Sequence, residues 1–240
     1  MVMAYLFLKA QGLAGKLVAD IRIDGAGKKV TRSDNCRVSD LSVSSDNLTF
    51  TYEAKSLPYP IDTSYYDNEK HTQADALSVI PFMDEMNYEG LSVSGLSDGY
   101  YGLTIGGEFI GRFTARELER GINMALLQNT PQYKQAMKIR QMNEERWLKE
   151  RKMREFYWVE YNLMRKTGML WACDEAAVDT LRKYRPHDIF LQWNGDLWLQ
   201  YMHKGIREDC VNEQQDLVDR IYEQNKPIPL QIEIKKFTDL

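Results

Sequence analysis

The feature that most constrains this chain of 240 residues is a long stretch without a helix breaker. Thr130-Pro131 predicts a helix start, because threonine caps helices and proline is tolerated at the first helical position. The next breaker is Gly168. We therefore expect a helix of about 36 residues, roughly 54 Å long at 1.5 Å per residue. A helix of that length favours a projecting or bridging element.

Side-chain character changes along this predicted helix. Its middle, residues 143–152, has only Trp147 and Leu148 as apolar residues, whereas residues 153–164 are rich in methionine, aromatic and aliphatic side chains. A polar helical segment stays in water, and an apolar one packs into a core. The pattern predicts a hydrated middle and a far end docked in a helical core.

Before this helix the chain has the two-residue period of β-strands. Apolar Leu48, Phe50 and Tyr52 alternate with polar neighbours, and the turn 24–27 separates two strand-like runs. Tyr101, Leu103 and Ile105 share one face and precede Gly106-Gly107, a two-residue hairpin signal. Residues 17–113 therefore read as an antiparallel β module.

The remaining elements follow from local signals. Thr114 and Glu117 form a capping box that predicts a helix to about Leu127. Residues 57–75 read as a loop and residues 76–86 as a short apolar passage of unassigned type. Further predicted elements are helices at 174–184 and 208–224 and a last strand within 228–236. The fold class is α+β: a buried N-terminal helix, the antiparallel module and a helical region over residues 114–240.

The N-terminal helix is apolar on every side. Residues 1–8 place their apolar side chains around the whole circumference, so two packing partners are expected. A secretory signal has basic residues before its apolar run, but the first one here is Lys9, which follows the run. The run is also shorter than the roughly 20 residues of a membrane span. We expect neither a signal peptide nor a membrane segment.

Composition narrows the choice of partners. The net charge of −4 gives no general attraction to nucleic acid or to an anionic membrane. In the one basic segment, residues 131–170, lysines and arginines alternate with glutamates as on a solvated, salt-bridged face. Cys36, Cys173 and Cys210 lack metal-ligand spacing and are an odd number, so we expect buried free thiols and no metal or cofactor.

Sequence motifs give no catalytic candidate. Ser97 lies in Gly95-Leu-Ser97-Asp-Gly99, which matches the GxSxG nucleophile elbow, but a strand pattern follows where a helix is required. We expect Ser97 in a hairpin loop. The glycines of 102–111 fit no phosphate-binding loop. Three scattered histidines are expected to be surface or capping residues; they are His71, His187 and His203.

One aromatic segment suits a ligand. Trp193, Asp196 and Trp198 combine aromatic faces with a carboxylate, which fits a sugar ring or a protein partner. Core or interface packing is the alternative interpretation of the same aromatic residues. These three residues are our candidates for ligand or partner contact.

A resemblance to a known family covers most of residues 1–135. Residues 1–13 resemble the helix that follows the DGxHP block in SGNH (GDSL-type) hydrolases, and the remainder is similar to the C-terminal extension of a bacterial subgroup of that family. The matching signals are Asn35 to Leu41, Leu48 to Thr51, Leu57 to Pro60, Gly95-Leu96, Gly99 to Leu103, Arg112 to Thr114 and Gly121 to Ala125.

The resemblance implies a truncated ester hydrolase of the lipase or acylesterase kind. Residues 1–16 would be the last helix of a flavodoxin-like SGNH domain, whose Ser-His-Asp residues would all precede Met1. DNA upstream of the first codon would then encode a DGxHP-like segment. The β module and helical cap would shape the active-site cleft, and the full-length relative would be exported. The alternative is a stand-alone, non-catalytic binding module for carbohydrate or protein, with the Trp193/Trp198 region or the long helix as its contact surface. Residues 1–8 would then be covered by the protein's own helices or buried in an oligomer interface.

Overall fold

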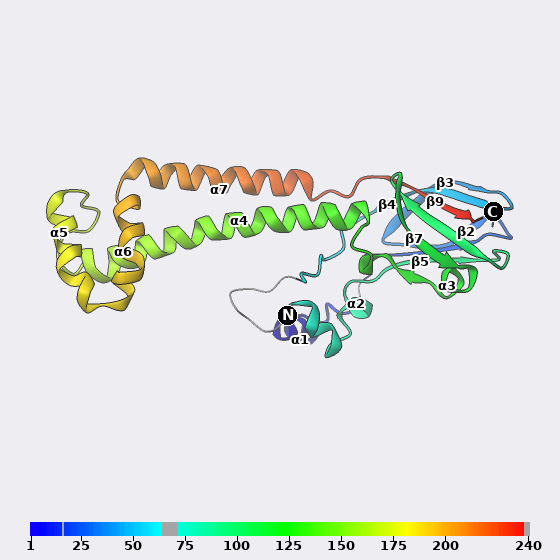
Figure 1. The fold of residues 1–240 in the computed structure, drawn as a ribbon, viewed down its shortest axis with the longest axis horizontal. Helices are drawn as coiled ribbons and strands as arrows, with labels where there is room; N and C mark the ends of the chain where they lie inside the picture. The colour runs from blue at the N-terminus through cyan, green and yellow to red at the C-terminus, as the bar shows by residue number, and fades with distance from the viewer. Residues whose placement is uncertain (16, 64–71, 238–240) are drawn as a thin grey trace. The chain divides into compact units, whose positions relative to one another are not determined.

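The computed structural model describes residues 1–15, 17–63 and 72–237 (Figure 1). The chain divides into two compact units. Unit 1 comprises Met1–Lys138 and Asn225–Leu240, and unit 2 comprises Ile139–Gln224. The α+β class is confirmed, with a β-rich first unit and a helical second one. Among the described residues, no helix is long and apolar enough to cross a membrane.

Unit 1 contains a four-stranded sheet in the order β2-β1-β5-β8. Its strands are β1 (Ala19–Asp24), β2 (Lys29–Asp34), β5 (Glu89–Ser94) and β8 (Ile122–Asn123). The predicted turn at 24–27 joins β1 to β2 in an antiparallel hairpin. Strands β1 and β5, however, are parallel. The expectation of a wholly antiparallel module is therefore wrong for this pair. A parallel pair needs a long connection that returns the chain to the end of the sheet where the first strand began, and the residues between β1 and β5 provide it.

The second sheet has five strands in the order β3-β4-β9-β6-β7, and all its pairs are antiparallel. They are β3 (Cys36–Val43), β4 (Asn47–Ala54), β6 (Tyr100–Ile105), β7 (Glu108–Thr114) and β9 (Leu230–Lys236). The predicted Gly106-Gly107 hairpin joins β6 to β7. The predicted last strand is confirmed as β9, which lies between β4 and β6.

The two sheets share one apolar core. Alternation along β4 buries Leu48, Phe50 and Tyr52, and the same alternation along β6 buries Tyr101, Leu103 and Ile105. These side chains meet residues of the first sheet in a single cluster. Each fully buried aliphatic side chain contributes about 1.5–3 kcal/mol relative to its exposed state. The two-residue period predicted from the sequence is therefore what positions the core.

Helices of unit 1 are short. They are α1 (Val2–Ala10), the 3-10 helix η1 (Ala74–Ser78), α2 (Phe82–Glu85), α3 (Ala115–Arg120) and the 3-10 helix η2 (Met124–Leu126). The predicted capping box opens α3, since Thr114 and Glu117 bond each other's backbone amides. The predicted end at Leu127 is wrong. The helix stops at Gly121, whose φ of +93° breaks it, and Ile122 then pairs with Leu91 of β5.

Unit 2 is built from helices. Helix α4 (Pro131–Val159) enters it from unit 1 and continues as a π-helical segment, η3 (Glu160–Met164). The others are α5 (Glu175–Tyr184), the 3-10 helix η4 (Arg185–His187), α6 (Ile189–Tyr201) and α7 (Lys204–Gln224). The predicted capped start of α4 is present, because the Tyr133 amide donates to the Thr130 hydroxyl at 3.3 Å. Helix α7 begins four residues before the expected 208.

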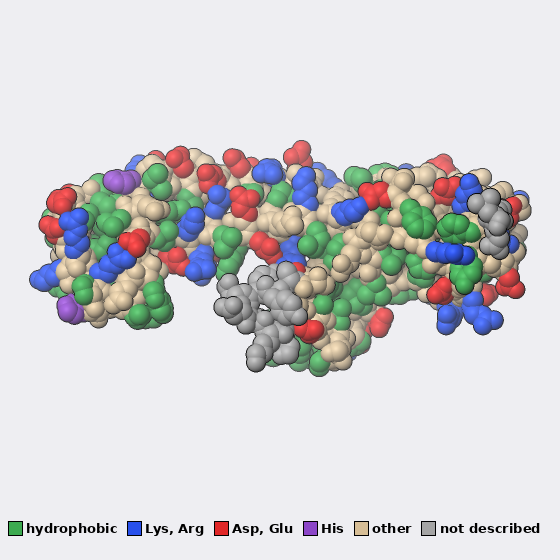
Figure 2. Space-filling model, viewed as in Figure 1, with side chains coloured by type: hydrophobic (Ala, Val, Ile, Leu, Met, Phe, Trp, Pro, Cys, Tyr) green, Lys and Arg blue, Asp and Glu red, His purple; other side chains and the backbone are tan. Residues whose placement is uncertain are grey.

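The predicted contrast along α4 is confirmed. Trp147 and Leu148 in the middle are half exposed, whereas Phe156, Val159 and Met164 have no exposed surface. These apolar residues join Trp198 and Leu181 in the core of unit 2. Lys149, Arg151 and Arg154 of α4 form ion pairs with glutamates on the same helix or on α7, and Figure 2 shows the two charge types interspersed there.

Two burial expectations are corrected. Helix α1 buries only Tyr5 within this chain, and Met3, Leu6 and Phe7 are exposed by 79%, 50% and 62%. The described residues cover one side of α1 and leave the opposite side open. The cysteines are free as expected, but Cys173 is exposed while Cys36 and Cys210 are buried.

Candidate functional site

Ser97 does not occupy a nucleophile elbow. It lies between β5 and β6, which belong to different sheets, so its segment is a crossover loop and not the hairpin loop expected. Its Oγ accepts a hydrogen bond from Lys236 Nζ at 2.7 Å and lies 3.1 Å from the Tyr101 hydroxyl. No helix begins after Ser97 to offer backbone amides to an oxyanion. The serine ties two strands of unit 1 together.

The histidines do not assemble a site within the described residues. His187 ends η4 and His203 lies in the turn before α7, while His71 falls outside the described residues. No group of three or more histidine, cysteine or acidic side chains with metal-binding geometry occurs in the described part of the chain. The described histidines therefore provide neither a metal site nor a paired acid and base.

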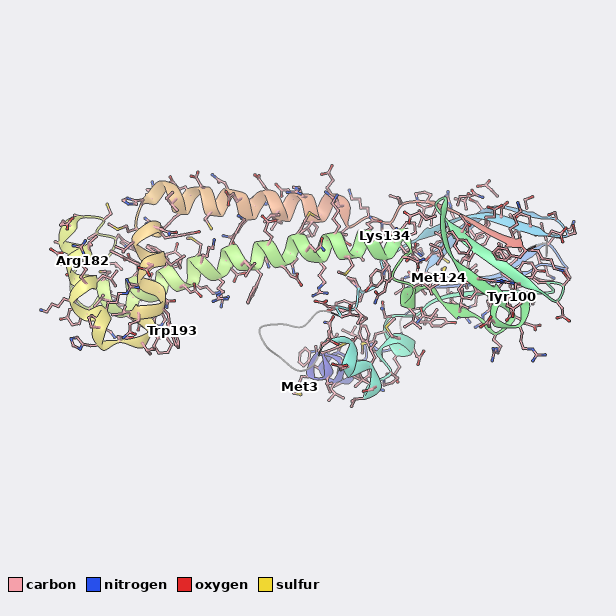
Figure 3. The ribbon with its side chains drawn as sticks, in the orientation of Figure 1. Met3, Tyr100, Met124, Lys134, Arg182 and Trp193 are labelled. Atoms are coloured by element: carbon pink, nitrogen blue, oxygen red, sulfur yellow. The ribbon has the colours of Figure 1, made fainter. Side chains whose placement is uncertain are left out.

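The three candidate contact residues do not share one surface. Trp198 is fully buried, and its Nε1 donates to Glu160 Oε1 at 2.8 Å. The Asp196 carboxylate accepts two hydrogen bonds from Arg185, both at 2.7 Å, which lowers the pKa of Asp196. Trp193 is 67% exposed and lies at the surface of α6 in Figure 3. Trp198 therefore cannot contact a ligand at the surface, whereas Trp193 remains a candidate contact residue.

An aromatic groove adjoins Trp193 in unit 2. It has a volume of about 420 Å³ and is lined by Trp147, Arg151, Arg154, Glu155, Trp158 and Asn194. The Phe190 ring packs on Trp158 at 5.2 Å between centroids and on Trp193 at 5.5 Å. Helix α4 thus contributes one wall, and α6 extends the aromatic surface to Trp193. The role of Trp147 and Trp158 was not predicted, although their spacing of eleven residues places both on one helical face.

A buried carboxyl group lies in the core of unit 1. Glu89 on β5 accepts hydrogen bonds from the Tyr52 hydroxyl at 2.8 Å and from Gln132 Nε2 at 3.2 Å. Both are received by Oε1, and neither Glu89 Oε2 nor Gln132 Oε1 has a partner among the described residues. Burial raises the pKa of Glu89 to about 7, and the two hydrogen bonds oppose that rise.

The chemistry open to Glu89 is limited by its surroundings. Burial also raises the pKa of Tyr52, so its hydroxyl remains a proton donor to the carboxyl group. A buried acid with a shifted pKa is a candidate general acid or base only when it faces a cleft. Glu89 has no exposed surface, and its neighbours are side chains of the core. We assign it to the structure of unit 1 and not to catalysis.

Helix α1 presents the third candidate surface. Tyr5 donates to Glu85 at 2.5 Å, and Lys9 pairs with the same carboxylate at 2.7 Å, which fixes one side of α1 on α2. A pocket of about 460 Å³ lies beside this contact, lined by α1 residues together with Leu13, Tyr59, Gln73, Phe82 and Met86. Met3, Leu6 and Phe7 have i, i+3, i+4 spacing and form a separate apolar face, with Met3 pointing outward in Figure 3.

Known proteins resemble this chain over both units. Residues 137–226 match a family described as the diltiazem deacetylase C-terminal helical domain, and this range coincides closely with unit 2. A solved structure described as a gut microbial diltiazem-metabolizing enzyme superposes with a TM-score of 0.91 at 39% identity. The match covers 98% of this chain and 53% of that enzyme, so the chain spans about half the enzyme's length. No curated protein matches significantly.

The helical part of the chain is thus similar to the C-terminal domain of a deacetylase, and the whole chain is similar to about half of a diltiazem-metabolizing enzyme. These similarities agree with the coarse expectation drawn from the sequence, an accessory region related to ester hydrolases. The surfaces that the sequence analysis missed are the groove between Trp147 and Trp158 and the open face of α1. The sequence signal for the groove is the spacing of Trp147 and Trp158, which places both on one face of α4. No local signal identifies which side of α1 stays open, because the helix is apolar all round.

Proposed function

We propose that this chain is the C-terminal half of an ester hydrolase that removes acetyl groups from small alcohol esters. The catalytic serine, histidine and aspartate lie in a region N-terminal to it. The chain itself supplies a β sandwich and a helical cap and contributes no nucleophile. The observation that carries the proposal is the 39% identity over 98% of the chain to an enzyme about twice as long.

The proposed catalytic region is an SGNH domain. This finer assignment rests on the resemblance of residues 1–13 to the helix that follows the DGxHP block. In that arrangement residues 1–16 contain the last helix of the domain, which is α1 (Val2–Ala10), and the strand-end loop just before the helix carries the catalytic histidine. A Ser-His-Asp triad cleaves an ester through an acyl-enzyme, which fits removal of an acetyl group.

Helix α1 is where the catalytic region would pack. One side of α1 is held by Glu85, while Met3, Leu6 and Phe7 form an apolar face that no described residue covers. Apolar side chains of this size are rarely left together in water, because burying each one contributes about 1.5–3 kcal/mol. A sheet from the catalytic region would bury this face and fix the β sandwich beside the cleft.

The test compares two proteins from the same gene. The first is this 240-residue chain, and the second adds the in-frame coding sequence upstream. We expect the chain alone to hydrolyse p-nitrophenyl acetate and diltiazem at the rate of buffer, and the longer protein to hydrolyse both. Ser97→Ala in the longer protein is the matched control and should keep full activity, because Ser97 only bridges Lys236 and Tyr101.

Two results would overturn the proposal. Hydrolysis by the isolated chain that disappears in Ser97→Ala would place the nucleophile in this chain. An in-frame stop codon upstream with no DGxHP-like or GDS-like segment would leave no catalytic region for the chain to complete. Activity of the longer protein that is lost on replacing its upstream GDS serine would support the SGNH assignment.

A further inference from the structure

We propose that the groove between Trp147 and Trp158 in unit 2 binds a neutral oligosaccharide. The proposal does not rest on the hydrolase function, because it concerns a surface that this chain forms by itself. Of the three residues expected from the sequence to contact a ligand, it keeps Trp193 and replaces Asp196 and Trp198 with Trp147 and Trp158 of the groove.

The groove has the length and the rings of a stacking platform. Trp147 and Trp158 are eleven residues apart on α4, which is about 16 Å along the helix at 1.5 Å per residue. Trp147 is 49% exposed, and the aromatic surface continues from Trp158 through Phe190 to Trp193, which is 67% exposed. A contiguous exposed aromatic surface is typical of a site that contacts a ligand or a partner. Pyranose rings offer a C–H face that packs on such aromatic surfaces.

The polar side chains of the groove point to a neutral ligand. Arg151 bonds Glu155 at 2.7 Å, and Arg154 lies 3.7 Å from Glu150 and 5.9 Å from the centroid of Trp147. Each guanidinium therefore already lies near a carboxylate, although Glu150 also pairs with Arg146 at 3.3 Å, and a charged ligand would compete with these ion pairs. The lining has two arginines and one glutamate, and nucleic acid or an acidic peptide would have to displace the existing ion pairs in order to bind these arginines.

The same groups suit hydroxyls. Arginine N–H groups, glutamate oxygens and the amide of Asn194 together provide both donors and acceptors along the rim. A purely apolar ligand would displace water from the donors and acceptors that these ion pairs leave free, which costs free energy. A ligand with an apolar face and a ring of hydroxyls matches both the tryptophans and the rim. This combination is the signature of a sugar ring.

The experiment uses the full 240-residue chain in native gels that contain neutral polysaccharides, namely xylan, mixed-linkage β-glucan or galactomannan. We expect at least one of them to retard the wild-type protein, with oligosaccharides of the same type quenching tryptophan fluorescence. Trp147→Ala and Trp193→Ala should each weaken binding about two- to tenfold, the effect of losing one aromatic contact. Tyr222→Ala, an exposed aromatic residue on α7, is the matched control and should bind as wild type.

Folding is monitored in parallel. Both tryptophans are surface residues, so melting temperatures of the variants should stay close to wild type. Absence of retardation by every neutral polysaccharide would overturn the proposal, as would equal binding by Trp147→Ala, Trp193→Ala and Tyr222→Ala. If the tryptophan variants instead abolish self-association measured by light scattering, the surface is an interface between copies of the chain and the proposal fails.

Discussion

The two units differ in how completely they hydrogen-bond their buried polar groups and cover their apolar helices. In unit 2 the buried Glu160 carboxylate is satisfied at both oxygens, by Trp198 Nε1 at 2.8 Å and by the Trp171 amide at 2.9 Å. The apolar end of α4 is packed on all sides that face the core. In unit 1 the buried Glu89 has one oxygen without a described partner, and α1 leaves a whole apolar face open. The buried carboxylate of unit 2 is thus fully hydrogen-bonded, whereas the described part of unit 1 has an unpaired buried oxygen and an uncovered apolar helix face on which a further domain could pack.

This difference teaches where a partner belongs. Apolar side chains that are covered by their own chain need no further partner, as Met153, Phe156 and Val159 of α4 illustrate. Helix α1 has comparable apolar side chains but is covered on one side only. The proposed catalytic region would therefore pack on unit 1, while the exposed aromatic groove of unit 2 is left for a ligand.

The largest expected effect comes from making the same substitution in the two helices. Phe156→Ala removes a fully buried ring from unit 2 and should lower the free energy of unfolding by about 3–5 kcal/mol. Phe7→Ala removes a ring that is 62% exposed, and should change that free energy by no more than about 0.5 kcal/mol. Urea denaturation of both variants measures the contrast. Equal losses would mean that α1 is buried in the isolated chain and would break the comparison.

A second contrast concerns the two buried glutamates. The folded chain holds the Glu89 proton up to about pH 7, whereas the unfolded chain releases it near 4.5. Stability from this group is therefore complete below pH 4.5 and is lost as the pH rises toward 7, by about 3 kcal/mol in total. Glu89→Gln removes this loss, so the variant should be more stable than wild type at pH 8 and should lack the decline between pH 5 and 7.

Glu160→Gln is the matched control for that measurement. The carboxylate of Glu160 now accepts hydrogen bonds from two N–H donors, and the side-chain NH2 of glutamine would face one of these donors without accepting its hydrogen bond. The free energy of unfolding at pH 8 should fall by about 1–3 kcal/mol, the cost of an unsatisfied buried donor. Chemical denaturation at pH 5 and pH 8 follows both variants. A pH dependence of Glu89→Gln identical to that of wild type would refute the role assigned to Glu89.

The smallest expected effect is on dye binding by the isolated chain. An uncovered apolar face binds 8-anilinonaphthalene-1-sulfonate, which fluoresces on apolar surfaces. The double variant Met3→Ser/Phe7→Ser should reduce this fluorescence while leaving the melting temperature within a few degrees of wild type. Val211→Ser, on an exposed apolar residue of α7, serves as control. Unchanged fluorescence in the double variant would show that the α1 face does not attract apolar partners.

Local sequence signals predicted much of the fold. The Thr130-Pro131 start, the Thr114 capping box and the strand alternation in β4 and β6 each rest on contacts within a few residues, and each is present. The neighbours of a strand are set by residues far along the chain. For this reason the sequence patterns could not predict the parallel pairing of β1 with β5. They also could not predict that β9 lies between β4 and β6.

Trp193 and Trp198 do not share one surface, for a geometric reason that the sequence contained. Trp193 and Trp198 are five residues apart, and at 100° per residue their side chains lie about 140° apart around a helix. One faces the core and the other faces solvent, as the structure shows. The ion pair of Asp196 with Arg185 joins two elements across a turn, and residue type alone does not predict such a pairing.

Chemical oxidation of Met3 tests the central claim most directly. In the isolated chain Met3 is 79% exposed, and hydrogen peroxide should convert it to the sulfoxide as fast as a free methionine. Met164, with no exposed surface, is the internal control and should react slowly. Mass spectrometry of the longer protein, with the upstream catalytic region attached, should find Met3 protected to the level of Met164. Met3 oxidation at the same rate in both proteins would contradict the account, because α1 would then carry no catalytic region.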